Sequence, residues 1–218
     1  NHSSQILDSI VFHDWNNAFS DKNSNLGKRF IENYSNKFFF TAKKNRGLTL
    51  IQNIYTSQKQ LDWYRPHGEF EQVVVKLNQP LLPNDNVVIH LNYQIKLPND
   101  NFTKYGYSKE TYNLKYCFIT PVVFENGWKY LPHFDLDDLY ENPSDYQIEI
   151  QIPEKFKLFS NLETIRNENN KYLLSGKSIV NPEFVISQNS DFKTFNTDSS
   201  QIVTNMNFFE IGDEVKKS

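Results

Sequence analysis

The sequence contains very little sulfur, with one cysteine and one methionine among 218 residues. Cys117 has no second cysteine to pair with, so no internal disulfide can stabilise the fold. It lies in the strand-like run Tyr112–Ile119, where a buried or half-buried thiol behaves as a small apolar side chain. We therefore expect Cys117 to be inert and not a nucleophile.

Long apolar runs and an excess of positive charge are also missing. No stretch approaches the roughly 18 apolar residues that a membrane-spanning helix needs, so no membrane span is predicted. The formal net charge of −3 gives no overall electrostatic case for binding nucleic acid or an anionic membrane. No run of like charges occurs, although a basic patch could still form locally.

The sequence lacks the motifs of the common catalytic sites. None of the five histidines is followed by Glu, so the zinc-binding pattern H-E-x-x-H is absent. Neither G-x-S-x-G nor a P-loop nor G-x-G-x-x-G occurs, which leaves acyl transfer and nucleotide binding without support. For His133 a hydrogen-bonded structural role is favoured over a metal-binding one. We predict no enzymatic activity for these residues alone, and no cofactor.

Aromatic and aliphatic residues are plentiful. Hydrophobic residues make up 38% of the chain and aromatic residues 15%, with 18 Phe and 12 Tyr. A chain of this length can bury a sizeable core, while the mean hydropathy of −0.64 indicates a polar surface. One large β domain is the expected outcome.

Short apolar stretches between turn residues predict many strands. Ser24 is a candidate N-cap for a short amphipathic helix near residues 25–35, with Leu26, Phe30, Ile31 and Tyr34 at helical spacing. We expect residues 72–77 and 87–95 to pair as a hairpin, and residues 187–200 to form a long polar loop. Further strands are predicted at 6–12, 38–40, 48–55, 171–174, 184–187 and 201–209. The fold class is mainly β, with antiparallel sandwich or saddle-like sheets and one short helix.

The stretch Trp128–Asn161 carries the most specific pattern. Tyr146–Ile152 alternates apolar and polar residues without a slip, as a strand with one buried side does, and Pro153 then weakens regular pairing. Leu131–Asp135 precedes this strand, and Phe159–Asn161 follows it. Together these pieces resemble the "P.fDep" turn and the "vP..y...SN" strand end in the N-terminal domain of the aminopeptidase N family (gluzincin) of zinc metallopeptidases. Upstream, Phe12–Phe19 and Leu26–Phe30 are similar to a divergent bacterial branch of such enzymes.

This resemblance implies that the chain is the non-catalytic N-terminal β domain of a longer zinc metallopeptidase. Residues 1–200 would form that domain, and residues 201–218 a last strand and a tail leading toward the catalytic domain. Zinc and the general base would then come from residues beyond Ser218. The implied partners are that catalytic domain and the peptide substrate of the parent protein. Residues at the domain interface or in the wall of the substrate cavity would be Phe118, Pro121, Phe124, Trp128, Pro132, His133 and Phe134.

Other interpretations remain open at this level. The chain begins with Asn1, as after removal of a signal peptide or at a designed boundary, and with the family analogy this favours an extracytoplasmic location, periplasmic or cell-surface. A free-standing extracytoplasmic β module could bind glycan or peptide through a platform of aromatic residues such as Trp63, Tyr64, Tyr105, Tyr107 and Trp128. The parent could also be a degenerate, inactive homologue. The acidic stretch Asp135–Asp138 with Glu141 favours a solvated turn over a calcium site.

Overall fold

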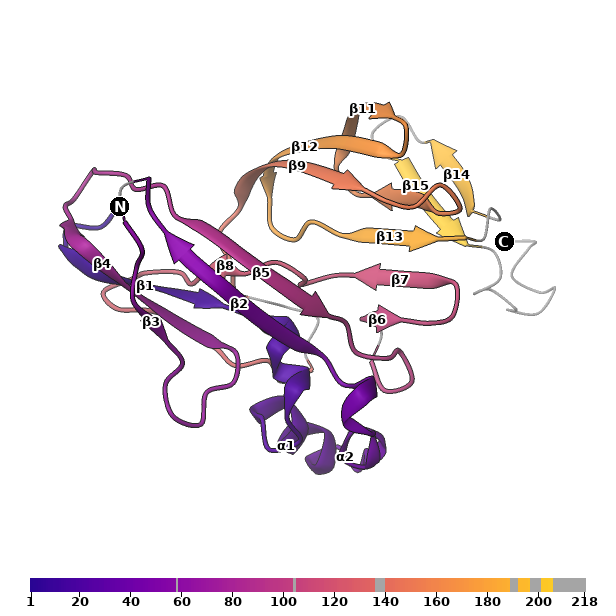
Figure 1. Cartoon of the computed structure of the whole chain (residues 1–218), viewed down its shortest axis with the longest axis horizontal. Coiled ribbons are helices and arrows are strands. Elements are labelled where there is room, and N and C mark those ends of the chain that lie inside the picture. The colour runs from indigo at the N-terminus through magenta and orange to yellow at the C-terminus, as the bar shows by residue number, and fades with distance from the viewer. Residues whose placement is uncertain (58, 104, 136–139, 189–191, 197–200, 206–218) are drawn as a thin grey trace.

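The computed structural model describes residues 1–57, 59–103, 105–135, 140–188, 192–196 and 201–205, and of the last two ranges only the backbone. Strands dominate, and every pair of strands within the sheets is antiparallel, which confirms the predicted fold class (Figure 1). The helical segments are η1 (Trp15–Ser20), α1 (Asn25–Glu32), α2 (Lys37–Phe40) and η2 (Lys43–Asn45).

The N-terminal half forms a first sandwich. One sheet has the strand order β3 (Trp63–Tyr64), β4 (Gln72–Leu81), β1 (Leu7–His13) and β8 (Thr120–Pro121). It packs on the pair β2 (Leu48–Tyr55) and β5 (His90–Lys96). Phe12 from β1 meets Val73 and Val75 from β4 and Ile54 from β2 in a shared core cluster. The alternation of apolar residues along these strands therefore builds the interior between the two layers.

The C-terminal half forms a second sandwich, whose strands run from pink through orange to yellow in Figure 1. Its core joins Leu162 and Leu174 to Phe184, with Leu114 packed alongside. Tyr146, Ile148 and Ile150 of β9 also pack on this core while Gln147, Glu149 and Gln151 are exposed, as the alternation predicts. The sheets are β10 (Lys157–Ser160), β13 (Phe184–Ser187), β7 (Thr111–Leu114) and β6 (Gly106–Tyr107); β11 (Glu163–Glu168), β12 (Lys171–Ile179) and β9 (Ser144–Gln151); and β14 (Phe192–Asn196) with β15 (Gln201–Asn205).

Several predicted pairings and boundaries are wrong. Residues 72–77 and 87–95 supply strands but no hairpin, because β4 pairs with β1 and β3 while β5 pairs with β2. Residues 38–40 belong to helix α2, in which Phe38 reaches the core. The predicted loop 187–200 contains strand β14. Of the predicted last strand 201–209, β15 covers 201–205 and the remainder lies outside the described residues, as does the predicted tail to residue 218.

Helix α1 begins where the sequence predicts. The Ser24 side-chain oxygen accepts a hydrogen bond of 3.0 Å from Gly27 N–H, the N-cap geometry. Leu26 and Phe30 are buried, but the helix ends at Glu32 and Tyr34 is 99% exposed. The expectation that Ile31 and Tyr34 share the buried face is therefore wrong. Ile31 is 47% exposed, and the φ of 57° at Tyr34 turns the chain out of the helix.

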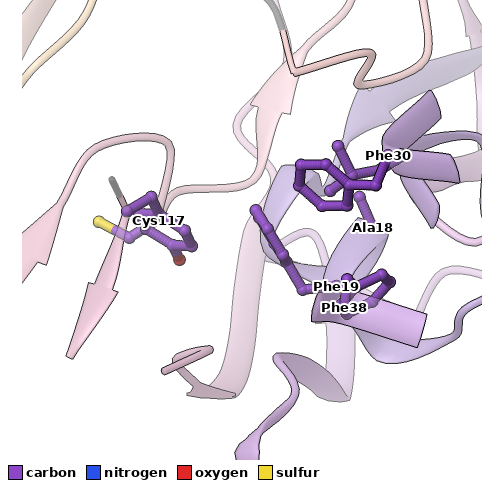
Figure 2. Packing of buried hydrophobic residues seen from close by; sticks show 7 residues of the cluster. Ala18, Phe19, Phe30, Phe38 and Cys117 are labelled. Atoms are coloured by element: carbon purple, nitrogen blue, oxygen red, sulfur yellow. The ribbon is translucent and has the colours of Figure 1, made fainter. Parts of the chain in front are cut away.

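The helical segments pack on a mostly aromatic cluster. Phe19, Phe30 and Phe38 lie together beside Ala18, while Cys117 approaches from the strand side (Figure 2). Burial raises the pKa of the Cys117 thiol to about 12, so the group stays a neutral thiol at physiological pH. This environment agrees with the expected inert cysteine.

Candidate functional site

Residues 120–134, called here the covering segment, begin as the edge strand β8 of the first sheet and then pass over the second face of that sheet. Val122 N–H donates to Val11 O at 2.9 Å, and Val11 and Val74 pack beneath Trp128 and Tyr130. Sheet residues on both sides of β4 are therefore buried, which explains the uninterrupted run Val73–Val75. The covering segment holds six of the seven residues predicted to form the interface or wall.

A tight turn in the covering segment places two aromatic rings against each other. Asn126 and Gly127 both have positive φ, and Phe124 and Trp128 pair across the turn. Their ring centroids are 5.0 Å apart with planes at 73°, a favourable edge-to-face arrangement. Both side chains are half-buried, so each presents one side to the surroundings.

These rings line a pocket of about 440 Å³, called here the Trp128 pocket. Such a volume suits a small ligand or a few side chains of a partner. The floor and walls combine apolar groups with a few polar ones, Glu141 among them. The lining consists of Asn1, His2, Ser3, Leu7, Ile10, Leu81, Thr120, Pro121, Val122, Phe124, Trp128, Glu141, Asn142, Ser144 and Tyr146.

Glu141 is the acidic group of this pocket. Its Oε1 accepts a hydrogen bond of 2.6 Å from the Thr120 hydroxyl. In the amide orientation that satisfies both of its side-chain atoms, Asn181 donates to Glu141 Oε2 at 3.2 Å. Burial raises the pKa of the Glu141 carboxyl, and the bond from Thr120 opposes that shift. A ligand that brings an amine or another hydrogen-bond donor would satisfy this carboxyl group further.

The other predicted wall residues occupy different surroundings. Phe118 packs edge-to-face on Phe184, with centroids 5.7 Å apart, inside the core. His133 is buried, and its Nδ1 accepts a hydrogen bond of 3.1 Å from Asp135 N–H. Phe134 is 39% exposed and Pro132 half-buried. The structure thus brings Pro121, Phe124 and Trp128 together in one pocket and leaves the remaining four outside it.

Sequence reasoning missed a buried polar cluster below the covering segment. Asp14 forms an ion pair with Arg65 and accepts a 2.7 Å hydrogen bond from the Thr49 hydroxyl. Burial raises the pKa of Asp14, while the Arg65 guanidinium lowers it. Glu71 lies nearby, and its Oε2 accepts from His133 N–H at 2.9 Å. Burial raises the pKa of Glu71 to about 8, so this side chain is mostly neutral at pH 7.

His13 is the least usual member of this cluster. Its ring stacks on Tyr130 at 5.2 Å and contacts Trp15 at 4.9 Å. Within the described part of the chain, neither ring nitrogen has a hydrogen-bond partner. Burial lowers the pKa of His13 to about 4, which keeps the imidazole neutral. His13, Asp14 and Trp15 all lie in the segment Phe12–Phe19, but nothing in the pattern of that segment indicates that they are buried.

No group of three or more His, Cys, Asp or Glu in the described ranges is arranged to hold a metal ion. Most of the acidic stretch Asp135–Asp138 lies outside those ranges, so the predicted solvated turn and its calcium alternative are both untested by the structure. The helices that the structure describes are all too short or too polar to cross a membrane. Tyr105, one aromatic of the alternative binding platform, is buried and donates to Asn16 Oδ1 at 2.7 Å.

No protein-family model and no curated protein sequence matches this chain. Among solved structures it is similar to M1 zinc metallopeptidases. An M1 zinc metallopeptidase from Deinococcus radiodurans matches at 10% identity with a TM-score of 0.45. One point mutant of a two-domain M1 zinc metallopeptidase, in structures with bound L-tryptophan and with bound L-arginine, matches at 12% identity with TM-scores of 0.44 and 0.45.

Each match covers 91% of this chain but 39% of the matched enzyme. The chain therefore spans well under half of the length of these metallopeptidases. At such identities and TM-scores the likeness assigns neither an activity nor a substrate to this chain.

Proposed function

We propose that this chain is the non-catalytic N-terminal domain of a zinc aminopeptidase-like metallopeptidase, and that its covering segment helps to wall the peptide-binding cavity. The observation that supports this proposal most is the Trp128 pocket. Its lining includes Pro121, Phe124 and Trp128, three of the residues expected at the domain interface or cavity wall, whereas the turn Leu131–Asp135 that resembles the "P.fDep" pattern lies outside it. Zinc and the general base would be supplied by a catalytic domain outside this chain.

In this role the domain acts through shape. Phe124 and Trp128 are braced against each other and against the sheet, so the pocket wall is held in place before a ligand arrives. A fixed apolar wall limits which substrate ends can approach a catalytic centre and orients those that do. Glu141 adds one carboxyl group that can accept a hydrogen bond from a peptide amine.

The test uses the longer reading frame to which this sequence would belong. Translation downstream of Ser218 should contain H-E-x-x-H, and the complete protein should hydrolyse aminoacyl-nitroanilides. Trp128→Ala should then raise KM or lower kcat/KM for peptides while zinc content stays unchanged. Ile165→Ser is a suitable control, because Ile165 is an exposed residue of β11 that does not line the pocket. Equal kinetics for both variants, or nitroanilide turnover by the 218-residue chain alone, would contradict the proposal.

The second candidate is a free-standing extracytoplasmic module that binds glycan or peptide. The Trp128 pocket supports this candidate because Trp128, Phe124 and the carboxyl group of Glu141 all line it, and such groups can bind a sugar or a peptide. Binding of a glycan or peptide array ligand by the isolated chain, lost in Trp128→Ala, would select this candidate. A downstream reading frame without H-E-x-x-H would point the same way.

A further inference from the structure

One short part of the chain carries a net excess of positive charge. Residues 21–46 contain seven lysine or arginine residues and two acidic residues, a local net charge of +5 in a chain whose net charge is −3. The remaining residues therefore carry −8. This segment contains α1, α2 and η2. In Figure 1 the helices α1 and α2 project together from the lower edge of the sheets.

The same segment exposes large apolar side chains. Tyr34 is 99% exposed, Phe40 75%, Ile31 47% and Phe39 40%. Single exposed apolar residues are common on protein surfaces, but four within ten residues are unusual for a surface that faces water alone. We call this set, with Lys22, Lys28, Lys37, Lys43 and Lys44, the basic corner.

Charged and apolar groups adjoin each other in the basic corner. Lys22 Nζ lies 4.2 Å from the centroid of the Phe39 ring, and the Phe39 and Phe40 rings are 5.3 Å apart. Lys37 begins the same helix α2 that ends with Phe40. Lys28, Lys37, Lys43 and Lys44 are all exposed. The corner thus presents ammonium groups beside protruding rings.

The backbone beneath the basic corner is held by a buried ring and by side-chain hydrogen bonds. Phe38, between two exposed neighbours, is buried and contacts Phe30 and Phe102 at centroid distances of 5.7 and 5.1 Å. Arg46 Nε donates to Thr41 O at 3.0 Å, and Lys96 Nζ donates to Lys43 O at 3.1 Å. Because the backbone is anchored in this way, the exposed rings are displayed without the cost of ordering a flexible segment.

We propose that the basic corner docks the protein on an anionic lipid bilayer. Lysines beside apolar side chains are the composition by which surface-bound helices hold to headgroups while rings enter the interface. Each lysine near an anionic surface strengthens binding about fivefold, the equivalent of about 1 kcal/mol. The −8 charge of the remaining residues is repelled by the same surface, so the corner is the side that faces it.

The chemistry favours a bilayer over a nucleic acid. Proteins that hold single strands line a basic groove with rings on which bases stack. Here Phe39 and Phe40 meet edge-to-face, at 86°, and do not form a flat platform, and Ile31 cannot stack at all. The proposal shares no residue with the Trp128 pocket and stands independently of the proposed peptidase role.

The test is co-sedimentation of the 218-residue chain with phosphatidylcholine vesicles that contain or lack phosphatidylserine. We expect binding to the anionic vesicles at low salt, weakening as salt is added, and at least tenfold weaker binding to neutral vesicles. The triple variant Lys37→Gln, Lys43→Gln, Lys44→Gln should lose at least tenfold in affinity. Tyr34→Asn with Phe40→Ser should also weaken binding severalfold, since it removes the two most exposed rings.

The matched control is Lys109→Gln, Lys157→Gln, Lys177→Gln, which changes net charge equally through exposed lysines outside the basic corner. It should bind within about twofold of the original chain, because a lysine acts on the surface only within a Debye length of it. Equal losses in both triple variants would overturn the proposal, as would no binding to anionic vesicles at low salt. Tight binding to single-stranded RNA or to polyglutamate without vesicle binding would overturn it in favour of another partner. Circular dichroism of each variant separates unfolding from loss of the surface.

Discussion

The carboxyl group of Glu71 accepts a hydrogen bond of 2.9 Å from the backbone N–H of His133. Glu71 immediately precedes strand β4, while His133 belongs to the covering segment, so this bond ties the covering segment to the sheet. The carboxyl group is almost fully buried, and burial raises its pKa to about 8. Burial of this carboxyl group, which the bond from His133 only partly offsets, therefore makes the stability of the fold depend on pH.

Glu71→Gln should remove that dependence. Between the unfolded pKa near 4.5 and the folded pKa of about 8, the folded chain keeps a proton that the unfolded chain releases, so stability falls as pH rises through this window. The amide of Gln mimics the neutral acid and does not titrate. Denaturant unfolding at pH 5, 7 and 9 should show a shallower loss with pH for the variant than for the original chain. Parallel curves would contradict the assignment.

Glu71→Ala is the companion variant. It leaves the buried His133 N–H without its acceptor, which costs about 1–3 kcal/mol in the free energy of unfolding. Glu71→Gln retains an acceptor oxygen and should lose much less at pH 7. If Glu71→Ala and Glu71→Gln lost equal free energy of unfolding, loss of the hydrogen bond from His133 N–H would not explain the destabilisation by Glu71→Ala.

His13→Phe should reduce the loss of stability in acid, whereas the Glu71 variants concern the loss of stability as pH rises. The pKa of His13 is lowered to about 4, so as pH falls from about 6.5 to 4 the unfolded chain binds a proton that the folded chain refuses, and stability falls. Phe fills the space between Trp15 and Tyr130 without two unpaired nitrogens. We expect equal or higher stability at pH 7, by up to about 1 kcal/mol, and a smaller loss at pH 5.

His67→Phe serves as the control for this prediction, since His67 is exposed. It should alter neither the stability at pH 7 nor the loss between pH 7 and pH 5. Thermal unfolding followed by circular dichroism at both pH values provides the measurement. An unchanged acid response in His13→Phe would mean that other groups account for it.

Local sequence pattern predicted individual strands well in this protein. Residues 48–55 were expected as a strand and form β2 with the same bounds, and Tyr146–Ile152 buries the face that its alternation indicates. The period of two is a property of a single strand and needs no knowledge of its neighbours. Pairing is different, because β4 finds β1 across nearly sixty residues and β5 finds β2, which no short-range pattern encodes.

The same limit explains what could be foreseen of the candidate site. Pro121, Phe124 and Trp128 lie within eight residues, so one local turn brings them to one pocket. The positive φ of Tyr116 ends the predicted alternation after β7, and Phe118 turns into the core. His13 and Glu71 meet the covering segment only through the register of β1 and β4. Their role was therefore not readable from composition or spacing.

Gly106→Ala should damage the fold severely. Gly106 is buried with φ of 133°, and an added Cβ would lie 2.2 Å from Pro98 O. Pro98 O also accepts a hydrogen bond of 2.9 Å from Tyr107 N–H, so neither partner can move without breaking the start of this sheet. The backbone strain and the clash together cost about 3 kcal/mol or more.

Gly68→Ala separates the clash from the strain. Gly68 also has a positive φ, of 82°, but nothing lies within 4 Å of the position of an added Cβ. Only the conformational penalty of about 1 kcal/mol remains. The difference between the two variants in denaturant unfolding therefore measures the contact at Pro98. Equal destabilisation would show that Gly106 is retained for its backbone angles alone.

Tyr34→Asn should stabilise the protein, even though Tyr34 is the most exposed side chain of the basic corner. Tyr34 is 99% exposed and adopts φ of 57°, a left-handed conformation that asparagine tolerates better than tyrosine. Because the side chain buries almost nothing, its loss removes little packing, and relief of the backbone penalty should add about 0.5–1 kcal/mol. Tyr34→Val, which is β-branched and resists positive φ, should instead destabilise by a similar amount. Denaturant unfolding measures both variants, and a Tyr34→Asn protein less stable than the original chain would contradict this expectation.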